Sequence, residues 1–122
     1  MSQPQQLSQH TAKIRELNDA LRTTRDPIAW LMMNGSLVIT RSLDNKGNDF
    51  IDHAVSVMRS FSDFNEDNDP WGEHDCALME VDGETVIWKF DYYSPDMLVG
   101  SEAPWDASVT RRVLTLMLAQ DY

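Results

Sequence analysis

The sequence predicts a single α+β domain in which about three helices pack on a small antiparallel sheet. Residues 8–22 and 48–61 carry apolar side chains at spacings of three and four residues, the period of an amphipathic helix. Residues 76–93 form two runs rich in valine, isoleucine and aromatic residues around an Asp-Gly pair, which is typical of a tight hairpin turn. A chain of 122 residues, 42% of them hydrophobic, suits one core. We therefore expect one domain over residues 1–122, with residues 1–7 flexible.

The first half of the chain predicts a helix, a break and then extended structure. Pro27 interrupts the helical pattern of residues 8–22, because proline lacks an amide hydrogen and disfavours helical geometry in the residue before it. A strand is expected to follow. Asn34 and Gly35 then stand between two apolar runs and tolerate positive φ angles. This pattern indicates either a hairpin or a loop that leads into one strand.

Three further elements complete the predicted fold. The second helix is expected to begin with Asn48 as its cap and to carry His53 on its surface. In the hairpin around Asp82 and Gly83, alternation predicts that every second residue from Val86 to Tyr92 faces the core. A final helix is expected after Asp106 or Ser108 as cap, on an apolar stripe formed by Val109, Val113, Leu116 and Met117.

The net charge of −10 is concentrated in one part of the chain. Residues 63–106 hold thirteen acids and one base, Lys89, for a net charge of −12, whereas the segments on either side are nearly balanced. Such a block repels phosphate, so direct binding to nucleic acid or to an anionic membrane is disfavoured. It attracts basic protein surfaces, although acids can also serve only to keep a small protein soluble.

The acids are densest in the segment "NEDNDPWGEHD", residues 65–75, which permits three chemical interpretations. As a calcium loop, Asp63, Asn65 and Asp67 fit the first ligand positions, but Asn68 replaces the turn glycine and His74 the bidentate glutamate. As a metal-dependent hydrolase, the cluster Asp69, Glu73, His74 and Asp75 could supply an acid or base, yet no complete catalytic motif accompanies it. As structure, Pro70 and Gly72 shape a turn.

The third interpretation leaves the number of acids unexplained, and this favours a binding surface. An exposed Trp71 surrounded by carboxylates would make a binding hot spot, since tryptophan supplies contact area while the charges steer the partner. The partner-binding residues that we predict are Asp63, Glu66, Asp67, Asp69, Trp71, Glu73, His74 and Asp75. We predict no catalytic residue, no metal ligand and no cofactor. Cys76, the only cysteine, is expected to be a buried structural thiol.

Four segments in order, "LNDALRTT", "NDPWGEHD", "WKFDYY" and "VTRRVLTLMLAQDY", resemble a family of small acidic bacterial proteins of unknown function. The resemblance covers about the whole domain, and its most distinctive motif corresponds to Asn68, Asp69, Pro70, Gly72, Glu73, His74 and Asp75. It implies no assigned reaction. It does imply genes carried by plasmids and other mobile elements, and hence proteins that blunt host defence. The first sixteen residues and "DPIAWLMMNG" align less clearly.

Together these observations predict a non-enzymatic acidic interaction protein. Its concrete form is a DNA mimic, an anti-CRISPR or anti-restriction inhibitor that pairs carboxylates with a basic, nucleic-acid-binding protein. The alternatives are the small metal-dependent hydrolase and a homodimeric or antitoxin-like module that uses an apolar surface. The N-terminus lacks the pattern of a secretory signal, so we expect the protein in the cytoplasm.

Overall fold

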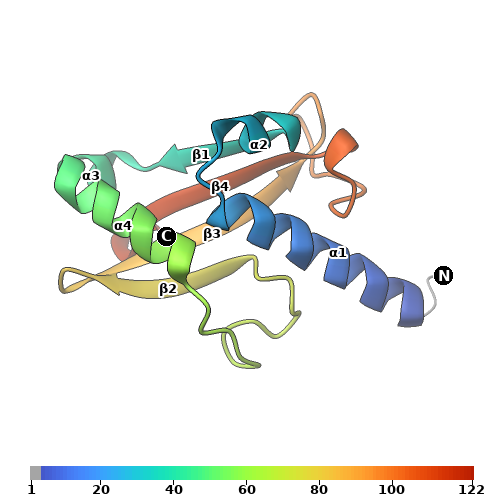
Figure 1. The fold of residues 1–122 in the computed structure, drawn as a ribbon, viewed down its shortest axis with the longest axis horizontal. Coiled ribbons are helices and arrows are strands. Elements are labelled where there is room, and N and C mark those ends of the chain that lie inside the picture. Colours follow the sequence, from blue (N-terminus) through green and yellow to red (C-terminus); the bar gives the residue numbers. More distant parts are fainter. Residues whose placement is uncertain (1–3) are drawn as a thin grey trace.

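The computed structural model describes residues 4–122, which form one layer of helices on one sheet (Figure 1). Residues 1–3, part of the segment expected to be flexible, lie outside the described residues. The α-helices are α1 (Pro4–Thr23), α2 (Pro27–Met32), α3 (Arg41–Asp44) and α4 (Asn48–Ser60). The strands are β1 (Gly35–Ile39), β2 (Cys76–Val81), β3 (Glu84–Tyr93) and β4 (Arg111–Leu118). Two 3-10 turns, η1 (Ala107–Val109) and η2 (Ala119–Asp121), flank β4. The predicted α+β class is confirmed.

The sheet is mixed, whereas the sequence predicted an antiparallel one. Its strand order is β1-β4-β3-β2, and β4 pairs antiparallel with β3 but parallel with β1. The antiparallel expectation came from the hairpin, where turn chemistry fixes the direction of the neighbouring strand. No such turn joins β1 to β4, because α3, α4 and the whole hairpin lie between them in the chain. The direction of β1 is therefore set by packing.

All four helices contribute to the core on one face of the sheet. The core cluster contains Leu21 from α1, Leu43 from α3 and Met58 from α4, and Trp30 of α2 packs against it. On the sheet, alternate residues point to this face, and Trp88 at its centre is fully buried. The prediction that Val86, Trp88 and Phe90 face the core is confirmed. We call the opposite side, which carries no helix among residues 4–122, the open face.

The hairpin and two of the helices agree with the sequence analysis. Asp82 and Gly83 connect β2 to β3 with φ angles of 50° and 82°, the left-handed geometry that an Asp-Gly turn favours. Helix α1 includes residues 8–22, and α4 begins at the expected position. The cap of α4 was predicted wrongly, because the residue that precedes its first turn is Gly47 and Asn48 already belongs to the helix.

The segment after Pro27 is a helix followed by one strand, so neither the strand expected there nor the hairpin forms. Proline is tolerated in a first helical turn, and Asp26 caps α2 by accepting a hydrogen bond from the Ile28 amide at 2.9 Å. Asn34 does adopt a positive φ of 54°, but this bend leads from the end of α2 into β1. The alternative of one strand after Asn34 is the one that the structure supports.

The final helix was also predicted wrongly, since residues 111–118 form the strand β4 in the middle of the sheet. Leu114 and Leu116 face the core, while Val113 and Thr115 point to the open face. An apolar run of this length fits both a helical stripe and a buried strand, and its place between two strands decides the outcome. Asp106 does cap the turn η1, where it accepts from the Ser108 amide.

We predict that Leu114→Ala lowers the free energy of unfolding by about 2–5 kcal/mol, because it removes a fully buried leucine from the central strand. Urea denaturation of the purified protein measures this change. Leu31→Ala is the matched control: Leu31 on α2 is 77% exposed, and its loss should change stability by less than about 0.5 kcal/mol. Equal effects of the two substitutions would contradict the buried strand.

Candidate functional site

The acidic segment forms a loop, residues 61–75, between α4 and β2, and we call it the acidic loop. In its first part, residues 63–68, asparagine side chains form hydrogen bonds with the backbone of the loop. The Asn65 side-chain oxygen accepts from the amides of Asp67 and Asn68 at 2.8 and 3.0 Å. The Asn68 side chain accepts from the Asn65 amide at 2.8 Å and donates to the Asp63 carbonyl oxygen at 2.7 Å. Asn65 and Asn68 therefore stabilise the turn of residues 65–68. The side-chain oxygen of Asn65 that would bind calcium instead accepts hydrogen bonds from backbone amides.

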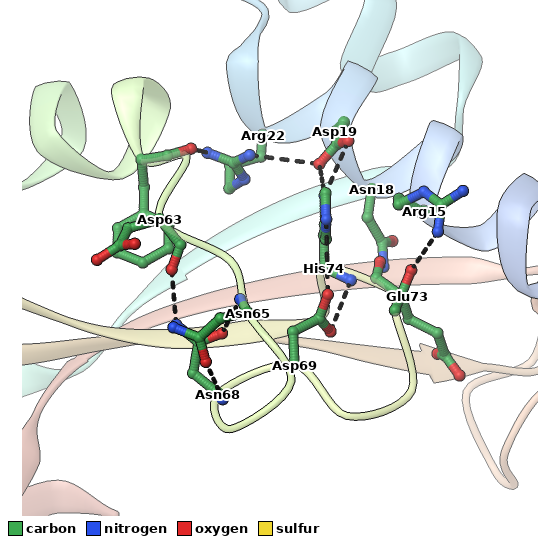
Figure 2. Close-up of polar contacts among 12 residues, drawn as sticks. Arg15, Asn18, Asp19, Arg22, Asp63, Asn65, Asn68, Asp69, Glu73 and His74 are labelled. Carbon is green, nitrogen blue, oxygen red and sulfur yellow. Dashed lines mark hydrogen bonds and ion pairs between the residues drawn. The ribbon is translucent and has the colours of Figure 1, made fainter.

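His74 lies at the centre of the second part of the loop, between two carboxylates (Figure 2). Its Nδ1 is 2.8 Å from an oxygen of Asp19 on α1, and its Nε2 is 3.5 Å from Asp69 Oδ2. The imidazole stacks on Phe64 with ring centroids 3.7 Å apart, and the His74 amide donates to Asp69 Oδ1. Asp69 itself is only 8% exposed. His74 thus joins the loop to α1 and has both ring nitrogens beside a carboxylate.

Helix α1 holds the loop at further points through long polar side chains. Arg15 donates to the Gly72 carbonyl oxygen at 3.0 Å, and Asn18 donates to that of Glu73 at 3.1 Å. Arg22 is buried and donates to the carbonyl oxygens of Met58 and Phe61, where α4 ends and the loop begins. One helix face therefore fixes both ends of the acidic loop.

Asn18 is also the centre of a buried polar network beneath the loop. It accepts a hydrogen bond from Nε of the fully buried Arg112 at 2.7 Å and donates to the Tyr92 hydroxyl at 2.8 Å. The Tyr92 hydroxyl donates in turn to Glu73 Oε1 at 3.3 Å. Arg112 also donates to the Pro104 carbonyl oxygen, so this network ties α1, β3, β4 and the loop together.

Burial shifts the pKa values of several groups in this network. Burial raises the pKa of Glu73, and the nearby Asp75 carboxylate raises it further, while the hydrogen bond from Tyr92 opposes the shift. Burial is also the main cause of the raised pKa of Asp75 and of Tyr92. The pKa of Arg112 is lowered by burial. Glu73 therefore holds its proton more tightly in the folded protein than in the unfolded chain.

The predicted partner-binding residues are divided by the fold into two groups. Trp71 is 77% exposed, and Asp63, Glu66 and Asp67 are exposed with it. Asp69 is buried, and Glu73, His74 and Asp75 are half-buried. The structure thus places four of the eight residues on the surface of the loop and gives Asp69, Glu73 and His74 contacts inside it.

Two observations concern the metal and thiol chemistry that was considered for the segment. Among residues 4–122, no group of three or more histidine, cysteine, aspartate or glutamate side chains is placed to hold a metal ion. Cys76 is half-buried, where full burial was expected, and desolvation raises the pKa of its thiol. A raised pKa disfavours the thiolate, so a nucleophilic role for Cys76 gains no support.

Sequence reasoning missed the residues that hold the loop, which are Arg15, Asn18, Asp19, Arg22, Tyr92 and Arg112. One signal was present. Asn18 interrupts the apolar stripe of Ile14 and Leu21 on α1, and a polar residue on a core face needs a buried partner. Arg112 likewise occupies an inward position at the start of the apolar run of β4.

The structure is thus that of a two-layer α+β protein whose acidic loop is held by hydrogen bonds to α1. A family model described as "Protein of unknown function (DUF3768)" matches residues 39–121, and the chain belongs to this family. Neither the curated proteins nor the solved structures include a match to the chain. No helix among residues 4–122 is long and apolar enough to cross a membrane.

We predict that Asn18→Ala lowers the free energy of unfolding by about 2–4 kcal/mol, because it leaves the buried Nε of Arg112 and the Glu73 carbonyl oxygen without the partner that Asn18 supplies. Urea denaturation measures the loss. Asn48→Ala serves as control, since Asn48 is exposed within α4, and should change stability by less than about 0.5 kcal/mol. An unchanged stability of the Asn18 variant would show that the network is not needed.

We predict that Glu73→Gln stabilises the protein at pH 7 relative to the natural sequence and loses this advantage in acid. Because the pKa of Glu73 is raised in the folded state, its contribution to stability is present below the ordinary value of 4.5 and is lost as the pH rises through the folded pKa. Glutamine removes that loss while keeping the oxygen that faces Tyr92. Urea denaturation at pH 3.5 and pH 7 measures both proteins, and an advantage of equal size at the two pH values would contradict the assignment.

Proposed function

We propose that the protein is a non-enzymatic interaction protein that binds a basic surface of another protein through its acidic loop. The observation that carries this proposal is the exposed Trp71, which shares the acidic loop with the exposed acids Asp63, Glu66 and Asp67. Hydrogen bonds to α1 fix this loop. A large aromatic side chain with 77% of its surface in water contributes nothing to this core. Such side chains are the usual centres of binding hot spots.

The fixed conformation of the acidic loop supports this proposal, because it lowers the conformational entropy that is lost on binding. A flexible loop loses conformational freedom when it binds, and this loss reduces affinity. The hydrogen bonds of Asn65, Asn68, Arg15 and Asn18 fix the loop backbone before any partner arrives. Trp71 and its neighbouring acids are therefore presented in one arrangement.

The charge indicates the class of partner. The −12 block repels nucleic acid and attracts arginine-rich and lysine-rich surfaces, and its long-range field speeds their encounter at low salt. Proteins that bind nucleic acid carry such surfaces. We propose a nucleic-acid-binding protein as the target and competition with its nucleic acid as the effect. An anti-restriction or anti-CRISPR role in the cytoplasm is the specific form, and it follows the resemblance to proteins of mobile elements.

The test is a pull-down from a lysate of the source organism at low and at high salt, followed by competition with duplex DNA. The variant combines Asp63→Lys, Glu66→Lys, Asp67→Lys and Trp71→Ala, which all lie on the surface of the loop. The natural protein should capture a basic nucleic-acid-binding protein at low salt, and the variant should lose at least about 90% of this capture. Duplex DNA should release the captured protein.

A matched control carries three charge reversals elsewhere, Asp44→Lys, Asp52→Lys and Glu102→Lys, at exposed positions outside the loop. It changes the net charge by the same amount and should retain the capture. Equal loss in the control and in the loop variant would show that net charge alone is responsible. Capture that persists at high salt in the loop variant, or that DNA does not release, would contradict the proposed function.

A further inference from the structure

The open face of the sheet carries apolar side chains among its polar ones, although no helix among residues 4–122 covers it. The register places Val38 of β1, Ile87 of β3, Val113 of β4 and Leu78 of β2 on this face. Leu78 is 63% exposed and Val38 is 45% exposed. Polar residues such as Thr85 and Thr115 share this face, as is usual for a solvated side of a sheet, but Leu78 and Val38 leave apolar area in water that a partner could cover.

The charges on the open face are balanced, in contrast to the rest of the protein. Lys89 and Asp91 lie two residues apart on β3, 3.4 Å from each other, and both are about one-third exposed. Arg111 and Glu80 lie on the same face and also cancel. A chain with a net charge of −10 thus has one large surface with no net charge. A second copy of the chain would meet little repulsion there.

We infer that the protein forms a homodimer in which two open faces pack against each other with their β3 strands antiparallel. The two-fold axis lies between the two sheets, parallel to them and perpendicular to β3, and it passes over β3 midway between Lys89 and Asp91. It places Lys89 opposite the partner's Asp91, and Asp91 opposite the partner's Lys89. The same rotation places Ile87 opposite the partner's Tyr93. Each ion pair therefore occurs twice, and sheets packed in this way lie about 10 Å apart.

The self-complementary order of these residues is the reason for choosing a second copy as the occupant. A two-fold interface requires that one surface match itself, and a basic residue two positions before an acidic one on a central strand meets this requirement. Tyr122, whose ring lies 5.9 Å from Lys89 Nζ, borders the face and adds apolar area. The acidic loop docks on α1, which covers the opposite face of the sheet, so dimerisation leaves Trp71 free.

The experiment is sedimentation equilibrium of the full chain over a range of protein concentrations, with charge-swap variants. The natural protein should be dimeric. Lys89→Asp and Asp91→Lys should each raise the dissociation constant at least about tenfold, because each places like charges opposite one another twice. The double variant Lys89→Asp/Asp91→Lys should restore the dimer, since the pairs re-form with exchanged signs. Circular dichroism confirms that each variant is folded.

Leu31→Glu is the control. Leu31 is 77% exposed and Leu78 63%, but Leu31 lies on α2, away from the open face. It should leave the dimer intact, and Leu78→Glu should weaken it. A monomer at every concentration would overturn the inference. So would a dimer that survives both single swaps, a double variant that stays monomeric, or a dimer that Leu31→Glu alone abolishes. These results are independent of the pull-down, which tests the acidic loop.

Discussion

The structure depends most on the buried polar contacts between α1 and the acidic loop. Asn18 and Arg112 are fully buried, and each has polar atoms that must find partners inside the protein. Asn18 finds them in the Tyr92 hydroxyl, in the Glu73 carbonyl oxygen and in Arg112. Arg112 donates through Nε to Asn18 and through Nη2 to the Pro104 carbonyl oxygen, while its Nη1 has no hydrogen-bond partner among the described residues. Removing one member of such a set leaves the others buried and unpaired, which costs more than the contact itself contributes. The loop, α1 and the two central strands are for this reason one unit.

This constraint explains why one acidic segment has two kinds of acid. Asp69 and Glu73 face inward, where Asp69 meets His74 and Glu73 meets Tyr92. Asp63, Glu66 and Asp67 face water and are free to act on a partner. The inward acids reduce the mobility of the loop, and the outward ones determine its surface charge. Trp71, which is exposed, lies between the inward acids Asp69 and Glu73 in the chain.

The sequence predicted those parts of the fold that depend on local chemistry. The Asp-Gly turn defined the hairpin, and the apolar stripe of residues 48–61 defined α4. The prediction failed where the local sequence fits both a helix and a strand and packing decides between them. The run from Arg111 to Leu118 became a central strand because β1 and β3 pair on its two sides.

The candidate site could be predicted only in part, for a related reason. Its surface residues, including Trp71, lie within one short segment, residues 63–71, and could be identified by composition. The residues that hold the loop are far away, since Asp19 and His74 are 55 positions apart and Asn18 and Arg112 are 94 apart. No local pattern joins residues at such separations. The burial of Asp69 depends on those distant residues, so composition alone could not separate it from Asp67.

Hydrogen exchange at the backbone amides of the acidic loop tests most directly whether the loop and α1 form one unit. The amides of Asp69, Gly72 and His74 each donate a hydrogen bond within the loop, to Asn65, to Asp69 and to the Asp69 side chain. These amides should exchange as slowly as amides in the interior of α1, because the loop and the helix form one unit. Exchange at the rate of an unprotected loop, while α1 stays protected, would contradict it.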